Sequence, residues 1–186
     1  MLVLVVVCGC VMWKGRNSMS NPSVVIETSK GTMKVELWAD KAPITVSNFL
    51  MYTDENFFDG LIFHRVISGF MIQGGGFMPN MSQKETHAPI KNEASAAAAN
   101  KRGTLAMART SDINSATGQF FINLVDNGFL DHKNESAQGF GYCAFGKVTE
   151  GMEVVDAIGK VATGNKGGHD DVPVEPVVIK SVRRAK

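Results

Sequence analysis

Residues 63–76, FHRVISGFMIQGGG, constrain the fold of this chain more than any other segment. Runs rich in β-branched and aromatic residues predict two strands, at residues 61–67 and 70–73, joined across Ser68-Gly69. The glycines that follow Gln73 then interrupt the strand pattern. The segment therefore predicts two neighbouring β-strands that end at a glycine run.

Arg65 is the unusual residue of the first strand, because most of its neighbours are apolar. Side chains alternate between the two faces of a strand, so Phe63, Arg65 and Ile67 are expected on one face, and His64 on the other. An arginine among apolar residues must either reach water or perform a specific task. Alternation alone favours the simpler interpretation, a charge on an edge strand.

Further strand-like runs indicate a mainly β protein. We expect strands at residues 24–28, 33–38, 104–108, 119–125, 142–149 and 177–182. The first two flank a short turn that contains Gly31, which predicts a hairpin. Residues 77–102 are expected to form a long polar loop. Because strands do not alternate regularly with helices, an antiparallel barrel or sandwich is favoured over a doubly wound sheet.

Two helices are expected at well-separated positions. Pro43 suits the first turn of a helix, where its missing N–H would have no partner, and the helix should end near Asp54. An apolar stripe that includes Phe49 and Leu50 supports this assignment. A shorter helix is predicted at residues 152–158, whose apolar side chains lie three residues apart. Such helices would cover the ends of a barrel or sandwich.

Length and composition exclude several classes of protein. A chain of 186 residues has room for one domain and little more. With 19 basic and 18 acidic residues the net charge is +1, which argues against a nucleic-acid-binding protein. The three cysteines lack the spacing of a disulfide framework, and Cys143 is expected to be a buried thiol.

Motifs for metal, phosphate and nucleophilic chemistry are missing from the sequence. The four histidines show no metal-ligand spacing, so neither a catalytic metal nor another cofactor is expected. The glycine run at 74–76 is not followed by Lys-Ser or Lys-Thr, and no serine lies in a G-x-S-x-G turn. Residues 164–171, GNKGGHDD, could contact a cation, but a solvated loop is favoured.

Several motifs together resemble the cyclophilin family. FHRVI-x-x-FMIQGG is followed by GTLAMA at residues 103–108, QFFIN at 119–123, FGKV at 145–148 and GM-x-VV at 151–155. Their order and approximate spacing are those of cyclophilins, and the resemblance covers about residues 24–182. The segments KNEA at 91–94 and DNGFL at 126–130 are similar to the short bacterial form of the family.

The resemblance implies a closed, antiparallel, eight-stranded β-barrel with two α-helices, and a peptidyl-prolyl cis/trans isomerase activity that assists protein folding. The barrier to rotation about an X-Pro bond comes from amide resonance. A cation or donor near the amide nitrogen stabilises the twisted state more than the planar one. Arg65 therefore becomes the candidate catalytic residue, acting over an apolar pocket without a covalent step.

The resemblance also assigns the remaining site residues. Gln73 is implied to be a second catalytic residue that hydrogen-bonds the substrate backbone, and Gln119 would support the site from beside it. The backbone of Ala108 and Arg109 would accept the peptide. The residues implied to line or close the proline pocket are Phe70, Met71, Phe121, Phe129, Leu130 and Tyr142. The implied partners are proline-containing segments of client proteins, and we expect a cytoplasmic monomer.

Three positions depart from the pattern of many eukaryotic cyclophilins. Phe129 replaces a tryptophan whose indole N–H helps to bind cyclosporin, so we expect weakened cyclosporin binding with catalysis largely kept. Tyr142 replaces a pocket histidine and still offers a hydroxyl group. Arg109 replaces an asparagine that acts mainly through its backbone, so the exchange should alter substrate preference more than chemistry.

Two other functions fit the same residues less well. A proline-peptide binding module would share the pocket and differ only in not needing Arg65, which this chain retains. A structural β-domain without a site would have to treat all the motifs as packing. An isomerase assay of Arg65→Ala separates the isomerase hypothesis from the binding-module hypothesis.

The first 18 residues form an extension with a different character from the domain at residues 19–186. An aliphatic run before Cys8-Gly9-Cys10 could be a lipoprotein-type signal with Cys10 lipidated, which would place the protein in the periplasm or on a membrane. However, no Lys or Arg precedes Lys14, although signal peptides begin with positive charge. The favoured hypothesis is that translation starts at Met19. A third hypothesis is that residues 1–18 form a structured arm. N-terminal mass spectrometry of the native protein distinguishes them.

Overall fold

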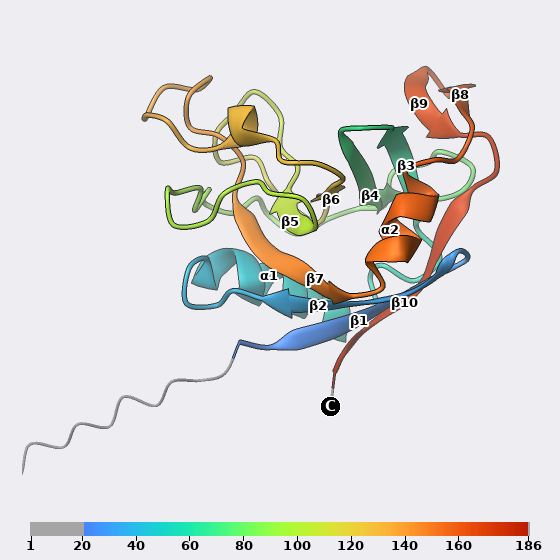
Figure 1. Ribbon diagram of the computed structural model, residues 1–186, viewed down its shortest axis with the longest axis horizontal. Coiled ribbons are helices and arrows are strands. Elements are labelled where there is room, and N and C mark those ends of the chain that lie inside the picture. Colours follow the sequence, from blue (N-terminus) through green and yellow to red (C-terminus); the bar gives the residue numbers. More distant parts are fainter. Residues whose placement is uncertain (1–20, 186) are drawn as a thin grey trace, which may run out of the picture.

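The computed structural model describes residues 21–185 and shows a β-barrel. The barrel strands are β1 Ser23–Thr28, β2 Gly31–Leu37, β3 Ile62–Ile67, β4 Met71–Phe77, β5 Thr104–Met107, β6 Phe120–Asn123, β7 Ala144–Glu150 and β10 Val177–Arg184. They close in the order β1-β10-β3-β4-β6-β5-β7-β2, and each neighbouring pair is antiparallel (Figure 1). The prediction of a closed eight-stranded antiparallel barrel is therefore confirmed.

The β1–β2 hairpin follows the predicted alternation. Met33, Val35 and Leu37 are buried in the barrel core, whereas Lys34 and Glu36 lie on the opposite, partly exposed face. Burying one face of a strand fixes its register, because a shift by one residue would turn the apolar side chains toward water. Among the other predicted strands, β6 and β7 begin one and two residues later than expected.

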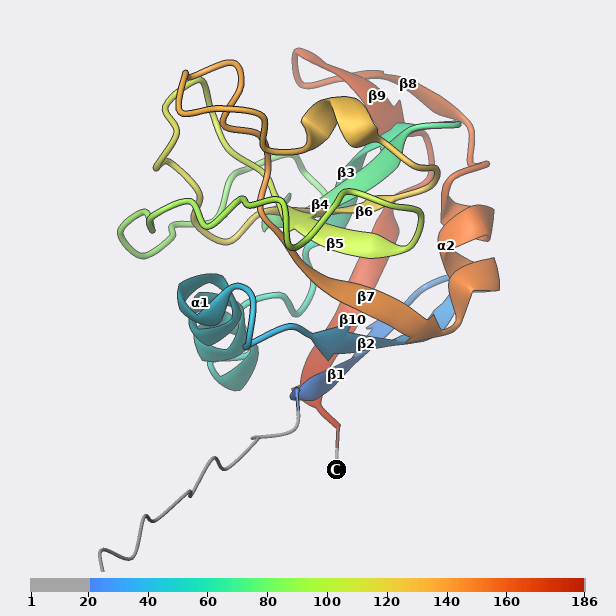
Figure 2. The same ribbon diagram turned by 60° about the vertical axis from the view of Figure 1, so that its left-hand side comes forward.

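Both predicted helices are present, α1 at Pro43–Asp54 and α2 at Met152–Ile158. Phe49 and Leu50 of α1 join the same core cluster as Val155 and Ile158 of α2. Figure 2 shows the two helices on opposite sides of the barrel, whose interior they help to close. None of the helices in residues 21–185 has the length and hydropathy required to cross a membrane.

Aromatic rings fill the centre of the core. The Phe49 ring lies 5.1 Å from that of Phe58, 5.5 Å from that of Phe120 and 5.3 Å from that of Phe145. Such tilted and edge-on pairs add to the free energy gained from burial. Cys143 is buried beside this cluster, as predicted, and burial raises the pKa of its thiol to about 11.

The glycine run does not interrupt β4, contrary to the prediction from sequence. Gly74, Gly75 and Gly76 all belong to the strand, which continues to Phe77. The pairing of β3 with β4 shifts on both sides of Phe63, so one strand bulges at Gly75 and Gly76 and the other at His64. Gly75 has φ of +82°, a left-handed conformation that glycine adopts without strain.

Residues 164–171 are not a solvated loop without structure. They belong to a hairpin of β8 Thr163–Lys166 and β9 His169–Pro173, which forms a separate two-stranded sheet. This hairpin contacts β3 and rises above the barrel rim as its own lobe (Figure 1). Sequence patterns did not indicate it because its residues are mostly exposed and carry little hydrophobic alternation.

The long loop between β4 and β5 is tied to α1 by Glu93. The Glu93 carboxylate accepts hydrogen bonds from the backbone N–H groups of Ile44 and Thr45, at 3.1 and 2.7 Å, and from the Thr45 hydroxyl at 2.8 Å. A carboxylate at this place satisfies free N–H groups and complements the helix dipole. The predicted extension at residues 1–18 lies outside the described residues.

Candidate active site

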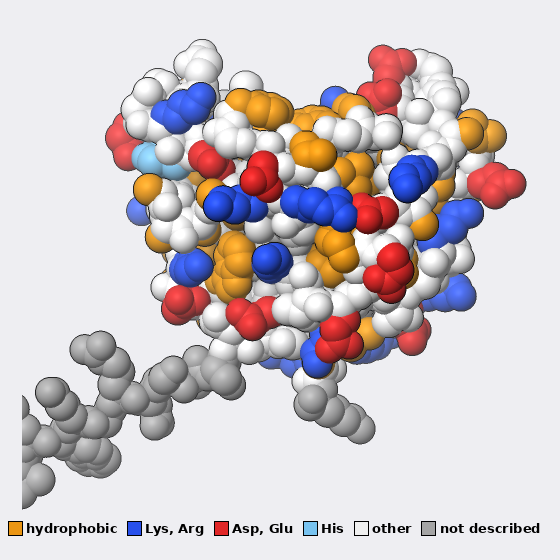
Figure 3. Space-filling model, in the orientation of Figure 1, with side chains coloured by type: hydrophobic (Ala, Val, Ile, Leu, Met, Phe, Trp, Pro, Cys, Tyr) orange, Lys and Arg blue, Asp and Glu red, His pale blue; other side chains and the backbone are white. Residues whose placement is uncertain are grey.

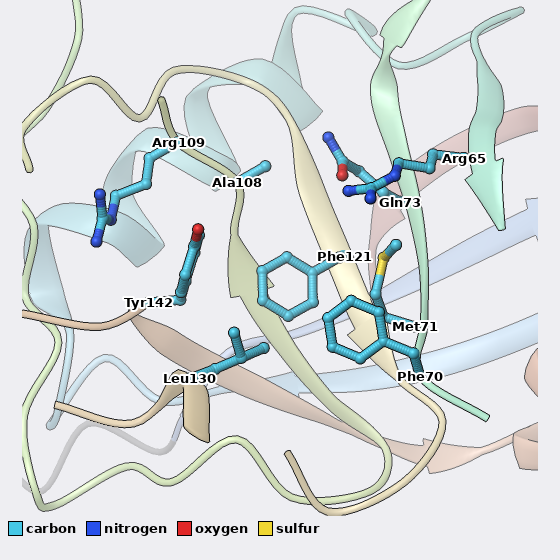
Figure 4. A pocket seen from close by; sticks show the side chains of 9 residues that line it. All are labelled: Arg65, Phe70, Met71, Gln73, Ala108, Arg109, Phe121, Leu130 and Tyr142. Atoms are coloured by element: carbon cyan, nitrogen blue, oxygen red, sulfur yellow. The ribbon is translucent and has the colours of Figure 1, made fainter. Parts of the chain in front are cut away.

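A cavity of about 210 Å³ lies on the outer face of the barrel, where Met71 of β4 and Phe121 of β6 point away from the barrel core. Its lining consists of Arg65, Phe70, Met71, Gln73, Ala108, Arg109, Phe121, Leu130 and Tyr142. Figure 4 shows apolar side chains on one side of it, with Arg65 and Gln73 together at one edge and Arg109 and Tyr142 at the other. The structure thus brings together nine of the eleven residues that the sequence assigned to a site.

The surface around the cavity forms a hollow between two raised lobes. One lobe is the β8–β9 hairpin, and the other contains the 3₁₀ helix η1, Gly128–Leu130, and the loops that follow it (Figures 1 and 3). Hydrophobic side chains occupy the floor between the lobes, and acidic side chains lie on the hairpin lobe (Figure 3). An extended chain could therefore lie across the hollow with a side chain in the cavity.

Neighbouring strands deliver the polar wall of the cavity. Arg65 on β3 pairs directly with Gln73 on β4, so their side chains emerge side by side. The bulge at His64 interrupts the alternation, so Phe63 points into the core while Arg65 remains exposed. The prediction that Phe63 and Arg65 share a face is wrong for this reason. The interpretation of Arg65 as an edge-strand charge also fails, because β3 lies between β10 and β4.

Gln119 lies outside the cavity and holds Gln73 from behind. The Gln73 Nε2 group donates a hydrogen bond of 3.0 Å to the Gln119 Oε1 atom. A Cβ atom on Gly76 would lie 2.5 Å from the Gln119 side chain, so any larger residue there would displace that side chain. The glycine run therefore makes room for the group that orients Gln73.

Arg109 directs its side chain away from the cavity. Its guanidinium donates to the backbone oxygens of Gly141, Thr110 and Ala137, and it lies 4.7 Å from the centre of the Tyr142 ring. Within the described residues, neither the Arg109 N–H nor the Ala108 C=O has a hydrogen-bond partner. The backbone at this edge is consequently free to bind an extended peptide.

Phe129 stands at the rim and does not line the cavity. Its side chain is 65% exposed, and its ring stacks on that of Phe70 at 5.6 Å. On the far side, the Phe121 ring meets Tyr142 edge-on at 5.8 Å. The apolar surface thus continues from the cavity onto its rim.

A network of buried amides supports the cavity from below, and sequence analysis missed its role. Asn127 donates to the Phe70 C=O at 3.0 Å and to Asn123 at 2.8 Å. Asn100 donates to the C=O groups of Leu130 and Tyr142, at 3.3 and 3.1 Å. The network therefore fixes the backbone of three cavity residues. In the sequence these asparagines resemble ordinary turn residues, because their burial follows from distant contacts.

His64 also differs from the prediction. Instead of facing away from Arg65, it lines a second cavity together with Arg65, since both side chains emerge at the bulge. It is 4% exposed, and its Nδ1 atom has no hydrogen-bond partner in the described structure. Burial, followed by the charges of His169 and Arg65, lowers its pKa to about 4. His64 is therefore neutral at physiological pH.

The polar side chains of the cavity lining are those of Arg65, Gln73, Arg109 and Tyr142. Residues 21–185 contain no group of three His, Cys, Asp or Glu side chains arranged to hold a metal ion. The cavity lining lacks a serine, cysteine or carboxylate that could act as a nucleophile. What remains is a fixed positive charge and amide donors beside an apolar pocket, which suits binding and charge stabilisation.

Comparisons with known proteins agree on one family. Residues 23–184 match the family model described as cyclophilin type peptidyl-prolyl cis-trans isomerase/CLD. Peptidyl-prolyl cis-trans isomerase B of Escherichia coli (strain K12) is 58% identical over 159 residues, which cover 86% of this chain and 97% of that protein. Peptidyl-prolyl cis-trans isomerase cyp18 of Streptomyces antibioticus is 56% identical over 161 residues, covering 87% and 97%.

A solved structure shares the fold at lower identity. The Cryptosporidium parvum cyclophilin type peptidyl-prolyl cis-trans isomerase, described in the presence of the dipeptide Ala-Pro, superposes with a TM-score of 0.76 and 26% identity. The match covers 88% of this chain and 99% of that one. The same barrel therefore persists at an identity far below that of the bacterial relatives.

Proposed function

The chain belongs to the cyclophilin-type peptidyl-prolyl cis-trans isomerase family and is such an isomerase, and from this premise we propose that Arg65 stabilises the twisted X-Pro amide of a bound peptide. Uncatalysed rotation takes roughly 10–100 s at 25 °C because the barrier is about 18–20 kcal/mol. Twisting ends the amide resonance and returns a lone pair to the nitrogen. A cation facing that nitrogen lowers the energy of the twisted state selectively.

The proline ring is assigned to the apolar side of the cavity. Met71 and Phe121 are nearly fully buried there, and Phe70 and Leu130 are partly buried beside them. A ring that enters this surface is removed from water, whereas its amide bond faces Arg65 and Gln73. A low-polarity surrounding strengthens the interaction between the guanidinium and the developing lone pair. This juxtaposition is the observation that carries the proposal.

The peptide backbone is held on both sides of the ring. Ala108 C=O and Arg109 N–H are free at one edge, and Gln73 is oriented by Gln119 at the other. Such contacts fix the reacting bond without recognising many side chains. We therefore propose broad use of proline-containing segments in client proteins, and a role in their folding. The Ala-Pro dipeptide named for the solved relative supports this substrate class.

The decisive experiment measures isomerisation of an Ala-Pro-containing peptide by a protease-coupled assay. Arg65→Ala is expected to lower kcat/KM by about 100-fold, the order found when one transition-state donor is removed. Arg65→Lys keeps the charge but loses the planar fork, so an intermediate value is expected. Arg183→Ala is the matched control, because Arg183 pairs with Asp59 on the outer surface. Wild-type rates in Arg65→Ala would refute the proposed mechanism.

A further inference from the structure

Arg65 forms part of the boundary between two cavities. The second cavity, of about 480 Å³, lies between the barrel and the β8–β9 hairpin. Its lining consists of His64, Arg65, Gln73, Phe77, Gln119, Gly168, His169, Asp170 and Asp171. Arg65 and Gln73 line both cavities, so the hairpin contacts the proposed catalytic residue from the side opposite the proline pocket.

The interactions of the Arg65 side chain with other polar groups in the described part of the chain are confined to the side that faces the β8–β9 hairpin. Within residues 21–185 its guanidinium makes no hydrogen bond, and its one ion-pair partner is Asp171. The Asp171 Oδ2 atom lies 3.9 Å from the Arg65 Nε atom, and both side chains remain partly exposed. The carboxylate therefore approaches the Nε atom of the guanidinium and not its two terminal nitrogens. Figure 4 shows those terminal nitrogens at the end of a side chain that reaches toward Gln73.

We propose that Asp171 is a positioning residue for the isomerase reaction: it holds the Nε side of Arg65 so that the terminal nitrogens face the prolyl amide. The inference rests on the proposed function, since it requires that Arg65 acts on the amide. An arginine side chain has several rotatable bonds, and an interaction at Nε restricts the torsions that precede the planar group. A small orientational change at a reacting bond can lower a rate substantially.

The strand that carries Asp171 is anchored to the barrel by burial and by contacts with β3. The next two residues, Val172 and Pro173, are buried, which anchors the strand in the protein. The His169 ring packs edge-on against Phe77 at 5.2 Å, and Phe77 packs against His64 at 4.5 Å. The hairpin is thus attached to the same strands that carry Arg65 and Gln73. Asp171 has φ of +60°, a conformation that aspartate tolerates better than most residues.

Positioning and simple electrostatics predict opposite changes in kcat when the Asp171 carboxylate is removed. A carboxylate near Arg65 partly neutralises its charge, so removing it would raise the catalytic power of the cation if charge alone mattered. Positioning predicts the opposite, a loss of kcat when the carboxylate is removed. Because an exposed ion pair contributes little to stability, folding should be almost unchanged.

The test compares Asp171→Asn with Asp170→Asn, which has the same change of charge one residue earlier. Asp170 accepts a hydrogen bond from Asn165 within the hairpin at 2.8 Å and forms no ion pair with Arg65. We expect kcat for a proline peptide to fall about fivefold in Asp171→Asn with KM nearly unchanged, and to stay within twofold of wild type in Asp170→Asn. Asp171→Gly suits the positive φ, and it replaces Asp171→Asn if that variant folds poorly.

A double variant shows whether Asp171 acts through Arg65. In an Arg65→Ala background, Asp171→Asn should cause no further loss. The proposal is overturned if Asp171→Asn and Asp171→Gly keep or exceed wild-type kcat, if Asp170→Asn loses as much, or if the loss persists without Arg65. If Arg65→Ala itself retains full activity, the proposed mechanism fails first, and the two failures are therefore distinguishable.

Discussion

The side chains of Phe129 and Arg109 at the pocket rim differ in what they contact. Phe129 presents an exposed ring stacked on Phe70, whereas Arg109 turns its charge onto neighbouring carbonyl groups and the Tyr142 ring. Arg109 therefore ties the loop that carries Tyr142, and its own N–H has no hydrogen-bond partner within residues 21–185. This arrangement is compatible with the expectation that Arg109 binds a peptide through its backbone.

Phe129→Trp is expected to strengthen cyclosporin binding. The exposed position can accommodate a larger ring, and an indole N–H adds a donor that phenylalanine lacks. One added hydrogen bond corresponds to about 1 kcal/mol, or roughly fivefold in Kd. Titration of isomerase inhibition would measure this shift, with kcat/KM for a proline peptide as the control. Nanomolar inhibition of the wild-type protein would contradict the expectation of weak binding.

At the scale of secondary-structure elements, β3 and β4 place Arg65 and Gln73, the proposed catalytic side chains, through their bulges. His64 is the extra residue on one strand, and Gly75 and Gly76 are extra on the other. Without these insertions the alternation would place Arg65 differently relative to Phe63. Local sequence predicted both strands, although it ended the second at Gln73, and it could not reveal bulges, which exist only relative to a paired strand.

Gly76→Ala tests the role of the glycine run. The added methyl group would lie 2.5 Å from Gln119 and displace it from Gln73. We expect KM for a proline peptide to rise several-fold, together with a loss of about 1–3 kcal/mol in the free energy of unfolding. Steady-state kinetics and urea denaturation measure the two effects. The control is Gly69→Ala, where a Cβ atom meets nothing within 4 Å although the positive φ adds some strain. Similar kinetics in both variants would argue against the role of Gly76.

Glu93→Ala should destabilise the protein by about 1–2 kcal/mol. The Glu93 carboxylate caps α1 through the N–H groups of Ile44 and Thr45, and lost caps cost this order of free energy. Glu85→Ala is the matched control, because Glu85 is exposed in the same loop. Urea denaturation should separate the two variants, and equal midpoints would show that the cap contributes nothing measurable.

At the scale of the whole molecule, burial couples the stability of the barrel to pH. His64 has a pKa near 4 in the folded protein, against an ordinary value of 6.5. The unfolded chain therefore takes up a proton at higher pH than the folded one. Stability from this residue is complete above about pH 6.5 and declines as the pH falls toward 4.

His64→Gln is expected to flatten this pH dependence. A shift of this size corresponds to about 3 kcal/mol between neutral pH and pH 4. Denaturant unfolding at pH 7, 5.5 and 4.5 should show a smaller decline for the variant than for the wild-type protein. If the free energy of unfolding fell equally with pH in both proteins, groups other than His64 would cause the acid sensitivity.

The sequence by itself determined the fold class, the helices and nine residues that line the cavity beside Arg65, because hydrophobic alternation and the cyclophilin-like motifs are local properties of the chain. Residues 63–76 already contained Arg65, Phe70, Met71 and Gln73. Only the tertiary structure decided that His64 shares a side with Arg65, that the glycine run continues β4, and that Asp171 faces the guanidinium. Each of these depends on strand register or on contact between distant segments. Such relations arise from packing, and no local pattern encodes them.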